Sequence, residues 1–169
     1  MKRITLIAFT ILLGLFITPY LSEAQTTINQ VSVKITGEVK APFDINLDSL
    51  NKFKQTEVIR KDKDGKDHTY SGVVLSDILQ KAGVSSGKDL RGKNLTKYVL
   101  IDAGDGYQVV FALAELDKDF TDRLVIVADM VDGKPLPAGE GPFRIIVQDE
   151  KKPARCIKMI TAIKIISAK

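Results

Sequence analysis

The spacing of short apolar segments is the feature that most constrains how this chain can fold. Alternating or continuous apolar residues predict about eight short strands, at 31–39, 55–60, 68–70, 98–101, 107–111, 124–128, 143–147 and 158–166, and a short extended piece at 43–45. Only 47–53 and 74–82 have the periodicity of helices. Strands and helices do not alternate regularly, so we expect an α+β fold with a mixed, curved or barrel-like sheet and short helices.

The first 24 residues have the organisation of a secretory signal. A basic start at Met1–Arg3 precedes the apolar stretch 4–17, and Ser22-Glu23-Ala24 provides a small-x-small cleavage site. The apolar stretch is shorter than the roughly 20 residues of a spanning helix, although an uncleaved membrane anchor is the alternative. We therefore expect a signal peptide at 1–24, a single domain at 25–169 with no membrane span, and a periplasmic or secreted location.

The scarcity of cysteine and histidine excludes several classes of protein. Cys156 and His68 are the only residues of their types, so an internal disulfide framework and zinc sites with Cys pairs or several His residues are ruled out. We expect Cys156, which lies in an apolar stretch, to be buried, and an exposed reactive thiol is the alternative. The formal net charge of +4 is too small to predict a nucleic-acid partner.

Several polar residues are only weak candidates for catalytic or metal-binding roles. The segment 62–67 has the acidic spacing of a calcium loop, but its Gly comes too early and no Glu follows, which favours a hairpin turn. His68 is interpreted as structural, because no orienting partner is indicated for a base. Asp102, Asp105, Glu115 and Asp132 could pair as acid and base, but Asp105-Gly106 and Asp132-Gly133 are common turn dipeptides, which favours a turn role alone. We assign no catalytic and no metal-ligating residue.

The strongest constellation lies in two basic loops near the C-terminus. The stretch 132–144 combines Pro and Gly residues with Arg144, and the stretch 151–158 adds Arg155 and Lys158. A stiff loop whose backbone amides approach closely, together with Arg and Lys, suits a phosphate or another anion. An ordinary surface loop is the alternative.

Four segments occur in the order found in one known family. Residues 72–83 read G-V-V-L-S-D-I-L-Q-K-A-G, and Asp105-Gly106-Tyr107 follows them. The stretch 132–144 contains D-G-K-P-L-P and G-P-F-R, and 155–158 reads R-C-I-K. Together they resemble the molybdopterin-binding domain of sulfite oxidase-type oxidoreductases over about residues 35–166.

The resemblance implies the family's α+β fold and a groove that holds the pterin and its phosphate. Arg144, preceded by Gly141, matches the phosphate-binding Arg, while Cys156, Ile157 and Lys158 match the turn beside the phosphate, with Arg155 leading into it. The hairpin Asp105, Gly106 and Tyr107 lies near the same cleft. These residues are the predicted cofactor-binding set, and molybdopterin is the implied cofactor.

One departure from the family bears on the chemistry. Family enzymes place a molybdenum-ligating Cys in the strand before the segment that matches 72–83, and neither 55–62 nor 68–71 contains one. We therefore expect an exported binding or interaction module for a small anionic ligand or pterin, or for an envelope protein partner, without molybdenum redox catalysis. The alternative is a molybdopterin oxidoreductase, or a subunit of one, in which His68 or Tyr107 faces the metal.

Overall fold

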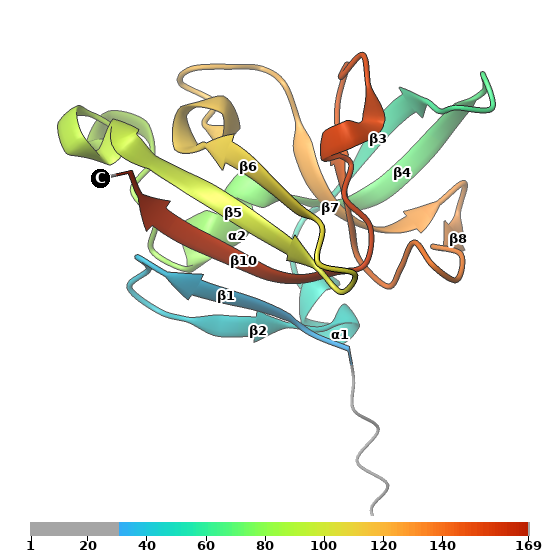
Figure 1. The fold of residues 1–169 in the computed structure, drawn as a ribbon, viewed down its shortest axis with the longest axis horizontal. Coiled ribbons are helices and arrows are strands. Elements are labelled where there is room, and N and C mark those ends of the chain that lie inside the picture. The colour runs from blue at the N-terminus through green and yellow to red at the C-terminus, as the bar shows by residue number, and fades with distance from the viewer. Residues whose placement is uncertain (1–30, 169) are drawn as a thin grey trace, which may run out of the picture.

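The structure, a computed structural model, describes residues 31–168 and contains two five-stranded sheets (Figure 1). The first sheet brings together the two ends of the described chain, because β1 pairs with β10. These two strands run parallel, and all other neighbouring strands of this sheet run antiparallel. Its strands, in spatial order, are β2 (Phe43–Ile45), β1 (Val33–Gly37), β10 (Ile160–Ser167), β5 (Lys97–Ala103) and β6 (Gln108–Ala112).

The second sheet is antiparallel throughout and carries the strands around which the clefts form. Its order is β3 (Gln55–Lys61), β4 (Asp67–Val74), β7 (Val125–Val131) and β8 (Lys134–Pro135), and β9 (Arg144–Val147) also pairs with β7. Gly72 lets β4 lie close to β7, since a Cβ atom there would be 2.1 Å from the carbonyl oxygen of Val127. Any other residue at this position would push the two strands apart.

The helices are short and pack on the sheets. Helix α1 (Leu47–Leu50) begins with a capping box between Asn46 and Ser49. Helix α2 (Leu75–Lys81) buries the predicted apolar stripe, including Ile78 and Leu79, in the main core. Four 3₁₀ turns complete the elements: η1 (Gly87–Asp89), η2 (Gly92–Thr96), η3 (Leu113–Leu116) and η4 (Pro153–Arg155).

The α+β class and the mixed sheet with short helices are confirmed, with one refinement. The strands form two sheets instead of closing into a barrel, and β2, β6, β3, β8 and β9 each pair with only one strand among the described residues. The connection between α2 and β5 contains the two 3₁₀ turns η1 and η2.

The sequence predictions for the N-terminus are only partly covered by the structure. The expected signal peptide at 1–24 lies outside the described residues. Between residues 31 and 168, none of the helices has the length and apolar character needed to cross a membrane.

Candidate functional site

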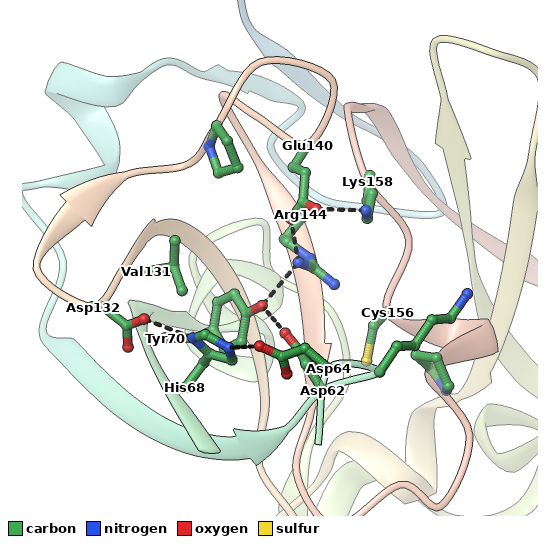
Figure 2. A pocket seen from close by; sticks show the side chains of 13 residues that line it. Asp62, Asp64, His68, Tyr70, Val131, Asp132, Glu140, Arg144, Cys156 and Lys158 are labelled. Atoms are coloured by element: carbon green, nitrogen blue, oxygen red, sulfur yellow. Dashed lines mark hydrogen bonds and ion pairs between the residues drawn. The ribbon is translucent and has the colours of Figure 1, made fainter. Parts of the chain in front are cut away.

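Two adjoining clefts lie where the chain connects its strands, and they share Lys63, Pro153, Cys156 and Lys158 in their walls. The first cleft holds about 450 Å³ (Figure 2). It lies among the β3–β4 hairpin, the β7–β8 turn, the loop before β9 and the segment before β10. Its other walls are Asp62, Asp64, His68, Tyr70, Val131, Asp132, Pro137, Glu140 and Arg144.

Arg144 is the most buried charged group of the first cleft, at 4% exposure. Its Nη1 donates to the hydroxyl oxygen of Tyr70 at 3.0 Å and to Oε2 of Glu140 at 2.5 Å. Its Nε is buried without a partner, and Nη2 has no hydrogen-bond partner among the described residues. This edge of the guanidinium therefore has no acceptor, and because Nε is closed off from solvent, an anion in the cleft meets Nη2 first and gains both hydrogen bonds of the edge only if neighbouring groups move.

Glu140 neutralises both cations expected at the anion site. Besides Arg144, it accepts a hydrogen bond from Nζ of Lys158 at 2.6 Å. Burial raises the pKa of Glu140, but the hydrogen bond from Lys158 and the charge of Arg144 outweigh this, so the pKa lies below its ordinary 4.5. The first cleft thus contains its own carboxylate where the resemblance places a phosphate.

Tyr70 links Arg144 to the end of β3. It is buried, its hydroxyl donates to Oδ2 of Asp62 at 2.5 Å, and the Arg144 guanidinium lies over its ring at 5.0 Å. Burial and the neighbouring Asp62 carboxylate raise the pKa of Tyr70 well above its ordinary value. The phenol therefore stays protonated and acts as a fixed donor to Asp62.

His68 connects two turns at the side of the first cleft. Its Nδ1 lies 2.6 Å from Oδ2 of Asp132 and its Nε2 lies 3.0 Å from Oδ2 of Asp64 (Figure 2). Hydrogen bonds to Asp132 and Asp64 raise the pKa of His68 to about 9, so the imidazolium is present at neutral pH. Neither partner was predicted: Asp132 comes from a distant turn, and Asp64, four residues away, was interpreted only as part of a hairpin turn.

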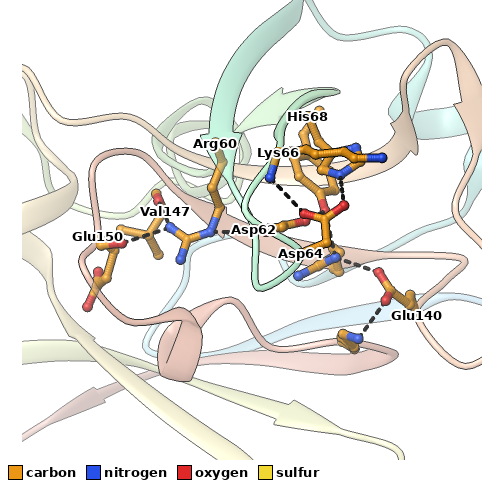
Figure 3. Close-up of polar contacts among 11 residues, drawn as sticks. Arg60, Asp62, Asp64, Lys66, His68, Glu140, Val147 and Glu150 are labelled. Atoms are coloured by element: carbon orange, nitrogen blue, oxygen red, sulfur yellow. Dashed lines mark hydrogen bonds and ion pairs between the residues drawn. The ribbon is translucent and has the colours of Figure 1, made fainter.

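Arg60 ties the end of β3 to the segment that follows β9. It is 5% exposed, and its Nη1 donates to the carbonyl oxygens of Val147 and Glu150, both at 3.1 Å (Figure 3). Its Nε lies 3.6 Å from Oδ1 of Asp62. Sequence reasoning missed Arg60, whose only signal is that it shares the buried face of β3 with Val58.

The second cleft holds about 460 Å³ and is lined by the β5–β6 hairpin and the segment 152–158. Besides the four shared residues, its walls are Ala103, Asp105, Tyr107, Lys152, Ala154 and Ile157. Of the predicted cofactor-binding residues, Asp105, Tyr107 and Ile157 line this cleft, Arg144 lines the first, and Cys156 and Lys158 line both.

Three residues of the predicted set lie outside the cleft walls: Gly106, Gly141 and Arg155. The guanidinium of Arg155 is occupied by Glu150 and Glu115, at 2.9–3.0 Å, and lies over the ring of Phe111. Gly141 packs against Leu136, where a Cβ atom would lie 2.9 Å from the Leu136 Cβ. These contacts indicate a structural role for Arg155 and a packing role for Gly141.

The candidate acid–base carboxylates do not come together. Asp102 pairs with Lys164 at 2.6 Å. Asp105 accepts from the backbone amide of Tyr107, and Glu115 pairs with Arg155. Residues 62–65 form the expected hairpin turn, and among residues 31–168 His, Cys, Asp and Glu side chains form no cluster that could hold a metal ion.

The thiol of the chain fits molybdenum poorly. Cys156 is 4% exposed, as expected, and burial raises the pKa of its thiol, whereas a ligand must be a thiolate. The hairpin turn that follows β3 contributes Asp62, Lys63 and Asp64 to the first cleft, and none of them offers a sulfur ligand. The residues present therefore suit an anion better than a thiolate-bound metal.

Comparison with known proteins agrees with the fold. The chain is similar to a chain in the crystal structure of the sulfane dehydrogenase SoxCD from Paracoccus pantotrophus, with a TM-score of 0.64 and 18% identity. The match covers 81% of this chain and 38% of that chain, so this chain spans well under half of the other's length. No curated protein matches.

The family is established by a match over most of the chain. Residues 22–169 match the family described as Oxidoreductase molybdopterin binding domain. This chain belongs to that family, and the resemblance seen in residues 72–83, 105–107, 132–144 and 155–158 is confirmed at the level of the domain.

Proposed function

We propose that this protein is an exported binding module of the molybdopterin-binding fold, which binds a small anion or a pterin without molybdenum redox catalysis. The observation that carries the proposal is the unused edge of Arg144. A buried cationic donor without an acceptor is costly, and Arg144, unlike Arg60, whose Nε also lacks a hydrogen-bond partner, lines the first cleft, so a ligand oxygen there could supply an acceptor.

The surroundings of Arg144 support binding more than redox chemistry. Molybdenum in this family needs a soft sulfur donor, and the hairpin turn that follows β3 offers Asp62, Lys63 and Asp64 instead. The volume of about 450 Å³ is within the range of small-molecule sites. The proposal of export depends on the basic and apolar pattern of residues 1–24.

Calorimetric titration with pterin-6-carboxylate and with inorganic phosphate tests the binding. Arg144→Gln should weaken binding by about 1.5–3 kcal/mol, the value of a charge-assisted hydrogen bond, which corresponds to roughly 10- to 150-fold. Arg144→Lys keeps the charge but loses the planar edge, so its affinity should be intermediate. Arg91→Gln, an exposed residue outside both clefts, is the matched control.

Two results would overturn the proposal. One is that neither probe binds the folded wild-type chain. The other is that Arg144→Gln, with an unfolding curve like that of the wild type, binds as tightly as the wild type. Because Arg144 also contacts Tyr70 and Glu140, thermal unfolding of each variant must accompany the titrations.

A second candidate function is favoured by one observation. Cys156 lines the same cleft as the end of β3, although the two are far apart in the sequence. In a molybdopterin oxidoreductase, or a subunit of one, a partner or a rearrangement would have to turn this buried thiol into a thiolate that can bind the metal. The two functions differ in the molybdenum content of the purified protein.

A further inference from the structure

The second cleft differs in character from the first, because its floor is apolar. Ala103, Ile157 and Cys156 are buried in its floor, and Tyr107 forms a wall with 50% of its surface exposed. The Tyr107 hydroxyl donates to the carbonyl oxygen of Ala154 at 3.1 Å, and its backbone amide donates to Asp105 at 3.0 Å. These two hydrogen bonds hold the aromatic side chain in place at the wall of the cleft.

The rim of the second cleft is positively charged. Lys63, Lys152 and Lys158 line it, against the single carboxylate of Asp105. Lys158 is paired with Glu140, but Lys63 and Lys152 form no ion pair within the described residues 31–168. Unpaired lysines at the edge of an apolar cleft attract an anion whose remaining surface can be buried.

We propose that the second cleft binds a small organic anion with a flat apolar body, of the class of aromatic carboxylates. The aromatic body lies against Tyr107 and Ile157, and the carboxylate faces Lys63 and Lys152. The cleft volume of about 460 Å³ accommodates a molecule of this size. This inference goes beyond the proposed function, because it assigns a ligand class to the neighbouring cleft, which shares Lys63, Pro153, Cys156 and Lys158 with the first.

The lining argues against two other ligands for the second cleft. Inorganic phosphate has no apolar surface, so it would leave the floor of Ala103 and Ile157 exposed to water. A pterin ring carries several hydrogen-bonding groups, and the side chains of this floor offer them few partners. A fused hydrocarbon ring with one carboxylate can bury its apolar surface against the floor and place its charge beside the lysines of the rim.

Titration calorimetry of the wild-type chain with 2-naphthoate, and with the uncharged 2-naphthamide as comparison, tests the inference. We expect naphthoate to bind more tightly. Lys63→Gln combined with Lys152→Gln should weaken naphthoate binding about three- to tenfold, the range for two exposed ion pairs, and should leave naphthamide unchanged. The control combines Lys66→Gln with Lys151→Gln, exposed neighbours that line neither cleft.

Two further variants locate the aromatic body. Tyr107→Ala should weaken the binding of both naphthalene compounds, because it removes the aromatic wall of the cleft. Tyr107 is half exposed, and the unfolding curve of the variant checks that the fold is kept. Arg144→Gln should leave naphthoate binding within about twofold of wild type, because Arg144 lies in the first cleft.

The outcomes separate this inference from the proposed function. Equal affinity for naphthoate and naphthamide would overturn the role of the lysine rim. Loss of naphthoate binding in Arg144→Gln would move the ligand to the first cleft and overturn the inference. Failure of naphthoate to bind, while pterin-6-carboxylate still binds in an Arg144-dependent way, would overturn the inference and leave the proposed function standing.

Discussion

The carboxylate of Glu140 lies 2.5 Å from the guanidinium of Arg144, at the position where an incoming anion would also seek this cation. The same carboxylate holds Lys158 at 2.6 Å. Glu140 therefore competes with any anionic ligand of the first cleft. Binding there must either use the remaining edge of Arg144 or displace Glu140.

Removing this competition should strengthen anion binding. In Glu140→Gln, Arg144 and Lys158 lose their shared negative partner, so the affinity for pterin-6-carboxylate should rise by about 1–2 kcal/mol, or roughly 5- to 30-fold. Titration calorimetry measures the change. Glu150→Gln is the control, because Glu150 pairs with Arg155 outside the clefts. An unchanged or lower affinity in Glu140→Gln would show that the anion does not meet these cations.

The His68 bridge should make stability depend on pH in a defined window. The pKa of His68 is about 9 in the folded chain and ordinarily 6.5, so its stabilisation is complete below pH 6.5 and disappears as the pH rises through 9. The pKa values of Asp64 and Asp132 lie below the ordinary 3.8, so their contribution fades only in stronger acid. Because the pair is accessible to solvent, the Tm difference between wild type and His68→Gln should be modest; it should be greatest at pH 6 and vanish near pH 10. A difference that is constant over this range would contradict the ion-paired imidazolium.

Tyr70→Phe should destabilise the fold through the groups it leaves behind. The lost hydroxyl is the donor to Asp62 and the acceptor for Arg144, and the site is buried. We expect a loss of about 1–3 kcal/mol in the free energy of unfolding, measured by denaturant titration. Tyr98→Phe should have little effect, because Tyr98 is only partly buried and its hydroxyl forms no hydrogen bond with the described residues. Equal stability of Tyr70→Phe and wild type would argue against the network.

Cys156 should be unreactive until the chain unfolds. It is 4% exposed, and burial raises the pKa of its thiol, so little accessible thiolate exists at neutral pH. Modification by Ellman's reagent should be at least about tenfold slower in the native protein than in guanidinium chloride. Equally fast modification in both conditions would mean that the segment around η4 opens readily or that the thiol is activated.

The local patterns of the sequence predicted most elements of the fold but not how they associate. Residues 47–50 and 75–81 form helices, and β5, β6, β7 and β9 lie within two or three residues of their predicted ranges. The pairing of β1 with β10 depends on contacts between the two ends of the domain, which no local periodicity encodes. The division into two sheets likewise arises from long-range packing and could not be derived from strand spacing.

The sequence allowed us to predict candidate site residues from their residue types, but not which residues from distant segments they contact. Arg144 was singled out by its Pro- and Gly-rich loop, and the structure places it, buried, in the wall of the first cleft. That Arg155 is held by Glu115 and Glu150 could not be foreseen, because Glu115 comes from a distant turn. The proximity of Cys156 to the end of β3 was concealed for the same reason.

The central claim is that this member of the family binds its ligand without molybdenum, and metal content tests it most directly. The chain should be produced in a host that makes molybdopterin, purified, and assayed for molybdenum by mass spectrometry and for released pterin by fluorescence. Because the cleft lacks an available thiolate, we predict molybdenum far below one atom per chain, under about 0.1. Close to one molybdenum per chain would contradict the account and establish the oxidoreductase alternative.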